Sequence, residues 1–284
     1  MSPSFTSWED AVSWLRAQPG RRDLVLDAYY DDPLLAAAQR YADSAEWRAI
    51  QRLLPPAAEA TALDVGAGRG IASYALARDG FSVSALEPDP SMLVGAGAIR
   101  ALAAEASLKI EVIEDFSERL PFNDASFDVV FARAVLHHTR DLGAACREFA
   151  RVLKPGGLLL AVREHVISRT SDLQRFLDLH PLHSLYGGEH AFTLVEYQRA
   201  LGAAGLSIQA TIAPLASDIN LAPRTLRSAQ HEVASQLVPR HPLAARFVAA
   251  ALALPALWHL LLPLLERLDH RPGRHYSFVA RRPW

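Results

Sequence analysis

Residues 61–164 alternate short apolar runs with helical segments, and few folds accommodate such a pattern. Strand-like runs begin at Thr61, Phe81, Lys109, Phe127 and Leu158. Strands that are joined through helices need crossover connections, and these produce a mostly parallel sheet with helices on both faces. The pattern therefore predicts an α/β fold with a doubly wound, mostly parallel sheet.

The flanking segments extend this core. Residues 1–58 have apolar positions at helical spacing, which predicts an N-terminal helical lid, and residues 59–213 form the predicted ligand-binding core. Residues 214–273 are helical and rich in proline, which predicts a helical cap inserted before a final core strand in residues 274–284. With strands near 207–213 and 275–283, the predicted sheet has seven strands.

Composition excludes several classes of protein. The formal net charge of -2 gives no sign of the basic surface that nucleic-acid binding needs, so we expect no nucleic-acid partner. The single cysteine, Cys146, cannot form an internal disulfide bond. The N-terminus has acidic residues where a signal peptide has a basic start, and we therefore expect a cytoplasmic protein.

One stretch, 247–265, has no formally charged side chain. Its length suits a membrane span, but Pro255, Pro263 and His259 interrupt it and charges resume at Glu266. We expect packed helices buried in the protein, with peripheral membrane contact or a membrane span as the alternatives.

The sequence "LDVGAGRG" places three glycines, Gly66, Gly68 and Gly70, directly after the first predicted strand. In open α/β sheets this turn is the usual ligand cradle, and glycine lets a ligand approach the backbone closely. The dinucleotide fingerprint G-x-G-x-x-G requires a sixth-position glycine, but Ile71 and Ser73 occupy those positions. The spacing thus disfavours a nicotinamide dinucleotide, and no Gly-Lys-Ser/Thr follows to make a phosphate loop.

Four segments in order resemble the motifs of class I S-adenosylmethionine-dependent methyltransferases: "LDVGAGRG", "LEPDPSML", "LPFNDASFDVVFARAVLHH" and "RVLKPGGLLL". The resemblance covers roughly residues 60–165, and more weakly 190–213 and the last strand. It implies a Rossmann-like sheet and S-adenosyl-L-methionine as cofactor, with S-adenosyl-L-homocysteine as product.

The same resemblance implies a cofactor site at the carboxyl ends of the first four strands. Glu87 ends the second strand, where its carboxylate can accept both ribose hydroxyls. Asp115 and Phe116 match the adenine contacts, although a common Gly-Asp pair is missing and the two can exchange roles. Arg133 is expected at the methionine end, with an ion pair to Asp64 or Asp115 as the alternative. The implied cofactor-binding residues are Asp64, Gly66, Ala67, Gly68, Glu87, Pro88, Met92, Asp115, Phe116 and Arg133, with Asp89 beside them.

Methyl transfer from a sulfonium needs alignment, exclusion of water and, for some acceptors, a base. Imidazole titrates in the useful range, so we take His137, His138 and His165 as candidate catalytic bases. The alternative for each is an ordinary hydrogen-bonding role. His180, His183, Glu189 and His190 lie close in sequence, but no H-E-x-x-H motif or cysteine pair accompanies them, so we expect no metal.

The acceptor site is expected outside the core sheet. Tyr29 and Tyr30 are candidate lid residues over the ligand, and Tyr41 shares this reading, whereas for Trp47 ordinary packing is preferred. A Gly-Gly turn supplies three further candidate acceptor contacts, His183, Tyr186 and Glu189. The apolar cap suggests an apolar acceptor, a membrane surface or a homodimer interface.

These features together predict a methyltransferase that acts on a small molecule, by O-methylation of a saccharide, lipid-like or secondary-metabolite hydroxyl or carboxyl group. N- or C-methylation is the alternative within enzymes. An alternative of another class is a catalytically silent S-adenosylmethionine-binding or assembly protein.

Overall fold

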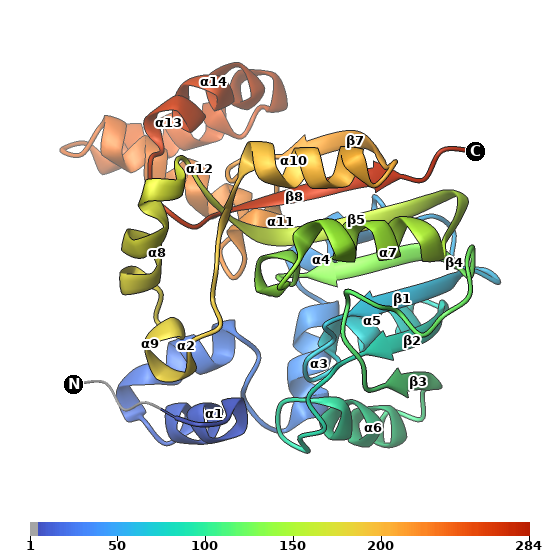
Figure 1. The fold of residues 1–284 in the computed structure, drawn as a ribbon. Helices are drawn as coiled ribbons and strands as arrows, with labels where there is room; N and C mark the ends of the chain where they lie inside the picture. Colours follow the sequence, from blue (N-terminus) through green and yellow to red (C-terminus); the bar gives the residue numbers. More distant parts are fainter. Residues whose placement is uncertain (1–4) are drawn as a thin grey trace.

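The computed structural model describes residues 5–284, so the first four residues of the predicted lid lie outside the described residues. An eight-stranded sheet runs through its centre in the order β3-β2-β1-β4-β5-β8-β7, with β6 paired to β5 (Figure 1). All pairs are parallel except β5 with β8 and β7 with β8. The predicted doubly wound α/β fold is confirmed. The strands are β1 Thr61–Val65, β2 Ser82–Leu86, β3 Ile110–Ile113, β4 Phe127–Arg133, β5 Leu153–Ile167, β6 Phe192–Thr193, β7 Ser207–Ile212 and β8 Arg274–Arg281.

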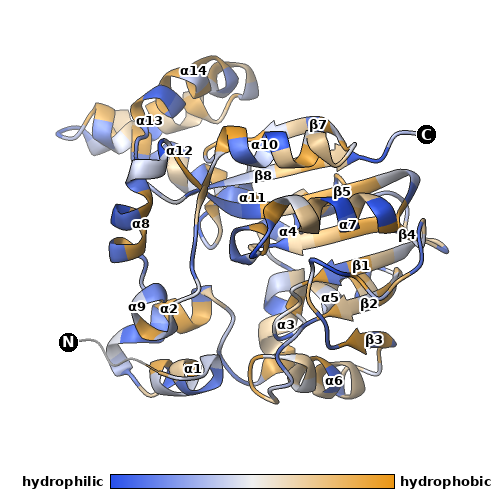
Figure 2. Cartoon of the chain, in the orientation of Figure 1, coloured by the Kyte–Doolittle hydropathy of each residue, from blue (hydrophilic) through white to orange (hydrophobic). Residues whose placement is uncertain are grey.

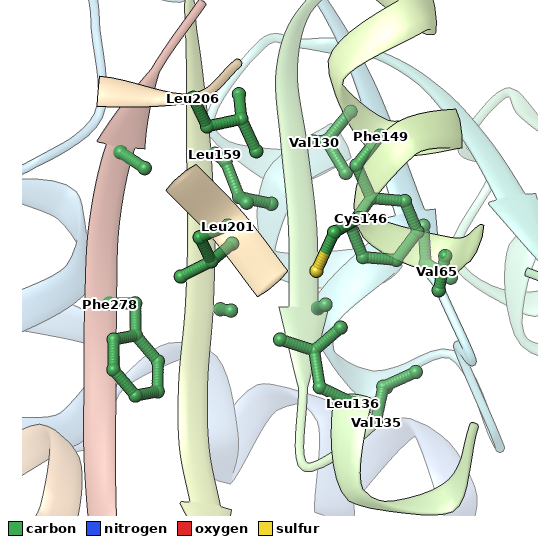
Figure 3. Close-up of a cluster of buried hydrophobic side chains, with 14 of the residues drawn as sticks. Val65, Val130, Val135, Leu136, Cys146, Phe149, Leu159, Leu201, Leu206 and Phe278 are labelled. Atoms are coloured by element: carbon green, nitrogen blue, oxygen red, sulfur yellow. The ribbon is translucent and has the colours of Figure 1, made fainter. Parts of the chain in front are cut away.

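Helices cover both faces of the sheet because each central strand is apolar on both sides. On one face, α7 (Leu142–Val152) and α10 (Leu194–Ala203) bury Phe149 and Leu201 against β4, β5 and β8 (Figure 3). The other face packs against α4 (Ala45–Gln51), α5 (Ile71–Arg78) and the short α11 (Asp218–Leu221), while α6 (Ala96–Glu105) packs beside β2. Cys146 is buried in the first of these layers, as a small apolar residue.

The N-terminal helices divide into two pairs with different roles. α3 (Leu34–Ala42) and α4 pack on the sheet side, where Tyr41 and Trp47 are fully buried. α1 (Trp8–Arg16) and α2 (Arg22–Asp27) instead form a small separate apolar cluster with α9 (His183–Tyr186), beyond the carboxyl ends of the parallel strands (Figure 1). Of these four helices, only α3 and α4 are therefore part of the core. The 3-10 turns are η1 Pro19–Arg21, η2 Leu136–His138 and η3 Thr170–Asp172, and α8 spans Leu173–Leu179.

The insertion before β8 forms α12 (Leu226–Leu237), α13 (Pro242–Leu252) and α14 (Pro255–Leu268), which enclose a small core around Trp258. The expectation that the apolar stretch 247–265 is buried is wrong for its outer face, since Phe247 and Leu260 are 78% and 75% exposed. Apolar positions are visible along α13 and α14 (Figure 2). Within residues 5–284 no single helix is long and apolar enough to span a membrane, and α13 with α14 meets that test only as a pair bent by 99°.

Candidate functional site

The glycine loop between β1 and α5 takes the backbone conformation that glycine favours. Gly66, Gly68 and Gly70 have φ angles of 60°, 55° and 81°. Ala67 N–H donates to the carbonyl oxygen of Leu86 at 3.0 Å, which ties the loop to β2. A Cβ on Gly68 would meet no atom within 4 Å, whereas a Cβ on Gly66 would lie 2.8 Å from Val135. The loop thus presents bare backbone to open space at Gly68.

Glu87 lies beside this loop, at the end of β2. Its carboxylate accepts the Gly68 N–H at 2.7 Å and the Asp89 N–H at 3.0 Å, and the residue is only 8% exposed. Burial raises the pKa of Glu87, while the two backbone N–H groups oppose that rise. A carboxylate oriented by backbone donors keeps further lone pairs for ligand hydroxyls, so the predicted ribose contact is geometrically feasible and stays a prediction.

Asp64 on β1 contacts the helix that follows the glycine loop. Its side chain is 1% exposed and accepts a 2.5 Å hydrogen bond from the Ser73 hydroxyl on α5. Burial raises the pKa of Asp64 to about 7. The hydrogen bond fixes the first turn of α5 relative to β1.

The remaining residues expected on the cofactor side form an open rim. Pro88 and Met92 follow β2, and the side chains of Met92 and Phe116 are 72% and 55% exposed. The Asp115 carboxylate accepts a hydrogen bond from the N–H of the next residue, Phe116, at 2.8 Å. Adenine contacts at this rim stay a prediction.

Arg133 makes an ion pair that the sequence analysis did not foresee. Its guanidinium donates to both carboxylate oxygens of Glu46 on α4, at 2.7 and 3.1 Å, and pairs with neither Asp64 nor Asp115. The rings of Tyr29 and Tyr41 lie 5.7 and 5.3 Å from the guanidinium carbon. Arg133 thereby joins the N-terminal helices to β4, and its contact with the cofactor stays a prediction.

The expected lid tyrosines differ in accessibility, since Tyr29 is buried and Tyr30 is half-buried. Tyr29 is 7% exposed and has a φ of 59°, and its carbonyl oxygen accepts a hydrogen bond from Arg69. The Tyr30 hydroxyl accepts a 3.2 Å hydrogen bond from the Trp8 indole, and burial raises its pKa to about 12. The Trp8 ring also lies 5.8 Å from the Tyr186 ring, so Tyr30 and Tyr186 belong to one aromatic cluster.

Tyr41 and Trp47 have a packing role instead. Both are completely buried on the sheet, and the Trp47 indole donates to Asp79 at 2.9 Å. A side chain without exposed surface cannot close over a ligand, so the lid reading of Tyr41 is wrong and the packing reading of Trp47 is confirmed.

Glu164 on β5 organises the chain after β4. Its carboxylate accepts the backbone N–H groups of Val135, Leu136 and His137, each at 3.1 Å, and its Oε2 lies 2.7 Å from His137 Nδ1. Burial raises the pKa of Glu164 to about 7, although the three N–H donors oppose the rise. Burial also holds the pKa of His137 well below its usual range, so its imidazole is neutral near pH 7.

A bulge in β5 directs these polar groups. Arg163 has a φ of 60°, and the pairing of β5 with β8 shifts register between Ala161 and Glu164. Bulges re-aim side chains and are common beside functional sites. The sequence analysis missed Arg163, Glu164 and Glu46, although one signal was available: "VREHV" interrupts a strand that is otherwise apolar.

The other histidine candidates gather around Glu189. His165 lies on β5 and its ring centre is 4.6 Å from that of His137. His138 is partly exposed, and its Nε2 lies 3.8 Å from Glu189 Oε2. Burial lowers the pKa of His165 well below the usual range and that of His180 to about 4, while it raises the pKa of Glu189.

His183 is half-buried near this group, and its Nδ1 makes no hydrogen bond among the described residues. The structure therefore brings His137, His138, His165 and Glu189 together from three separate segments.

A pocket of about 430 Å³ adjoins the histidines. His275 lines it, and the His275 ring centre is 4.7 Å from that of His165. The other walls come from α2, the segment after β7 and the start of β8, including Asp27, Asn220, Arg224, Arg271 and Arg274. The pocket thus lies between α2, the inserted segment and the start of β8, where His275 pairs with His165 of β5.

Comparison with known proteins agrees with this geometry. Residues 63–161 match the family model "Methyltransferase domain". This segment is therefore similar to a methyltransferase domain. It contains the glycine loop, Glu87, β4 and His137.

Two curated relatives are similar to part of this chain. A demethylmenaquinone methyltransferase from Chlorobaculum tepidum is 33% identical over 45% of this chain and 52% of its own length. A ubiquinone biosynthesis O-methyltransferase from Methylobacterium nodulans is 37% identical over 35% of this chain and 39% of its own. The aligned part of this chain thus spans about half or less of the length of these relatives.

A solved structure shares the fold over most of the chain. Geranyl diphosphate C-methyltransferase from Streptomyces coelicolor A3(2) matches with a TM-score of 0.59 and 16% identity, over 90% of this chain and 87% of that one. At that identity the match shows the fold alone.

The residues present fit S-adenosylmethionine, the cofactor that the sequence motifs and the matched methyltransferase domain imply. The open backbone at Gly68 and the oriented carboxylate of Glu87 are the groups that an adenosyl ligand needs at this edge of the sheet.

Proposed function

We propose that this chain transfers a methyl group from S-adenosylmethionine to an oxygen atom of a small, apolar acceptor. One observation carries the proposal. Val135 packs directly against Gly66, so the turn bearing His137 and His138 adjoins the glycine loop. A cofactor cradle and a group of imidazoles therefore share one edge of the sheet.

When bound, the cofactor supplies an activated methyl group on a sulfonium centre. The chain's own residues align the partners, exclude water and accept a proton. A neutral imidazole on His137, His138 or His165 can accept the proton of an acceptor hydroxyl. Trp8, Tyr30 and Tyr186 supply an aromatic wall that can exclude water.

The choice of an apolar acceptor is supported by two further observations. The curated relatives carry names that refer to demethylmenaquinone and ubiquinone, both of which contain apolar chains. The inserted helices also expose Phe247, Leu260 and Leu264, and exposed apolar patches favour apolar ligands or lipid surfaces.

Calorimetric titration tests the cofactor first. We expect saturable binding of S-adenosylmethionine and S-adenosylhomocysteine and no binding of NAD. Glu87→Ala should weaken binding by about 10- to 150-fold, since a charge-assisted contact contributes roughly 1.5–3 kcal/mol. Glu87→Gln, which keeps an acceptor for the Gly68 N–H, separates loss of the charge from collapse of the loop. Unchanged affinity in both variants would remove Glu87 from the ribose.

Transfer is tested with methyl-labelled cofactor and a panel of alkyl hydroquinones, alkyl phenols, alkyl amines and saccharides. Labelled ether from the alkyl hydroxyl compounds supports the proposal. Labelled amine or ring carbon would assign N- or C-methylation instead, and tight binding without transfer to any acceptor would indicate a silent binding protein. His137→Asn, His138→Asn and His165→Asn should lower turnover at one position without loss of cofactor affinity.

A further inference from the structure

Three potential metal ligands meet at the carboxyl ends of β4 and β5. They are His137 from the turn after β4, His165 from β5 and Glu189 from the loop after α9, and one ligand atom of each lies within 4.8 Å of the others. His137 Nε2 is 3.6 Å from Glu189 Oε2. Ligand atoms around an ion with bonds of about 2.1 Å stand about 3.0–3.4 Å apart, so small side-chain movements suffice to close the site.

Hydrogen bonds to the other ring nitrogen orient both imidazoles for metal binding. His165 Nδ1 is 3.0 Å from the Gly273 carbonyl oxygen, which can only accept, so Nδ1 carries the proton and Nε2 keeps a lone pair. His137 Nδ1 is likewise 2.7 Å from Glu164 Oε2, and in its ionised form this carboxylate accepts a hydrogen bond from Nδ1. Metal-binding histidines almost always donate their second N–H to a carboxylate or backbone carbonyl, as these two do.

Glu189 lacks a cationic partner among residues 5–284. Its side chain is 10% exposed, its Oε2 makes no hydrogen bond, and its nearest basic groups are imidazoles at 3.6–3.8 Å. Distances of this length are too long for hydrogen bonds. Because a buried carboxylate without a counter-charge is costly, a cation held between these groups would compensate Glu189.

We propose that His137, His165 and Glu189 bind one divalent transition-metal ion. Two imidazoles and one carboxylate suit zinc, iron, cobalt or nickel better than magnesium or calcium, which prefer oxygen ligands. His138 stands beside this set rather than in it, since its Nδ1 faces the Gly188 carbonyl oxygen at 3.0 Å and its Nε2 lies 3.8 Å from Glu189 Oε2. With three protein ligands, coordination positions stay open to water or to an oxygen atom of a bound small molecule.

The proposal does not depend on methyl transfer, because metal binding can be measured without cofactor or acceptor. If it holds, His137 and His165 use their free Nε2 lone pairs as ligands, and His138 is left as the candidate base.

The test uses the full chain without a polyhistidine tag, at pH 8. We expect one zinc or cobalt ion per chain by elemental analysis and by calorimetric titration, and a visible absorption band for the cobalt form. Glu189→Gln and His165→Gln should each weaken binding by more than about 100-fold, beyond the 10- to 100-fold typical of residues that only orient a ligand. His259→Gln, which alters an exposed histidine on α14, is the matched control and should bind as the unaltered chain does.

Circular dichroism checks that each variant is folded. If His165→Gln fails to fold, Glu189→Gln and Glu189→Asp carry the test, with partial binding expected for aspartate. Absence of stoichiometric metal, or affinity that Glu189→Gln leaves unchanged, would overturn the proposal and leave the cluster as an acceptor-binding site.

Discussion

Two charged groups stand at the ends of neighbouring strands, and they differ in whether their polar atoms have partners. At the end of β4, Arg133 and Glu46 satisfy each other with two hydrogen bonds and lie among aromatic rings. At the end of β5, Glu189 Oε2 and His183 Nδ1 are buried without hydrogen bonds among the described residues. Among the described residues, Arg133 and Glu46 leave no buried side-chain atom without a hydrogen bond, although the adjacent Tyr41 hydroxyl has none, whereas Glu189 and His183 each leave one.

This difference in hydrogen-bond partners distinguishes a structural ion pair from a group that can bind a ligand. Buried polar groups are almost always partnered in folded proteins, so a complete pair needs no ligand to explain it. Buried polar atoms without a hydrogen-bond partner destabilise the fold, and a ligand that supplies the partner removes that destabilisation. The Arg133–Glu46 pair therefore joins α4 to the sheet, whereas the cluster around Glu189 is the part of the molecule arranged for something that binds.

Breaking the complete pair should have the largest effect. Glu46→Ala leaves the Arg133 guanidinium buried without its counter-charge, and we expect the free energy of unfolding to fall by about 3–5 kcal/mol. Urea denaturation followed by circular dichroism measures this change.

The double variant Glu46→Leu/Arg133→Met is the control, because replacing both charges with apolar groups should recover most of the loss. Its affinity for S-adenosylmethionine also tests the cofactor contact predicted for Arg133. A cost below about 1 kcal/mol for Glu46→Ala would mean that the pair behaves as an exposed one.

An intermediate effect is expected at Glu164, which joins the two groups by holding the turn after β4. At pH 5, Glu164→Gln should lower the free energy of unfolding by about 1–3 kcal/mol, because the amide NH₂ cannot accept the His137 backbone N–H. The folded pKa of about 7 lies above the ordinary 4.5, so the unaltered chain loses this group's stability as pH rises from about 4.5 to about 7. The difference between the two proteins should therefore shrink over that range.

Urea denaturation of both proteins at several pH values checks the slope. The same variant sharpens the metal proposal, since an amide that donates to His137 Nδ1 moves the imidazole proton to Nε2. Metal affinity at pH 8 should then fall by about 10- to 100-fold. A difference in stability that grows with pH would contradict the raised pKa.

The arrangement of the glycine loop, Glu87 and Asp64 was predictable from sequence because its parts are local. The turn after β1, Glu87 at the end of β2 and the acidic Asp64 each follow from their position on a strand. The parallel order of strands then places them at one edge without further information.

The histidine side was not predictable in the same way. His137, His165 and Glu189 are brought together by a bulge at Arg163 and by the path of the 187–193 loop, and neither leaves a motif. The partner of Arg133 is equally hidden, because Glu46 lies in a helix whose packing on the sheet is set by Tyr41 and Trp47. Pairing between distant segments depends on tertiary structure, and residue spacing does not encode it.

The smallest effect on stability should come from the incomplete group itself. In chelator-treated protein, Glu189→Gln removes a buried charge that has no counter-charge and whose Oε2 makes no hydrogen bond, so the free energy of unfolding should not fall by more than about 0.5 kcal/mol. Glu196→Ala is the contrasting control seven positions along the chain. Its carboxylate accepts the Thr193 N–H at 2.7 Å in a capping box, and its loss should cost about 0.5–2 kcal/mol. If urea denaturation instead showed a loss above 2 kcal/mol for Glu189→Gln, Glu189 would be a structural partner like Glu46, and the contrast between the two groups would fail.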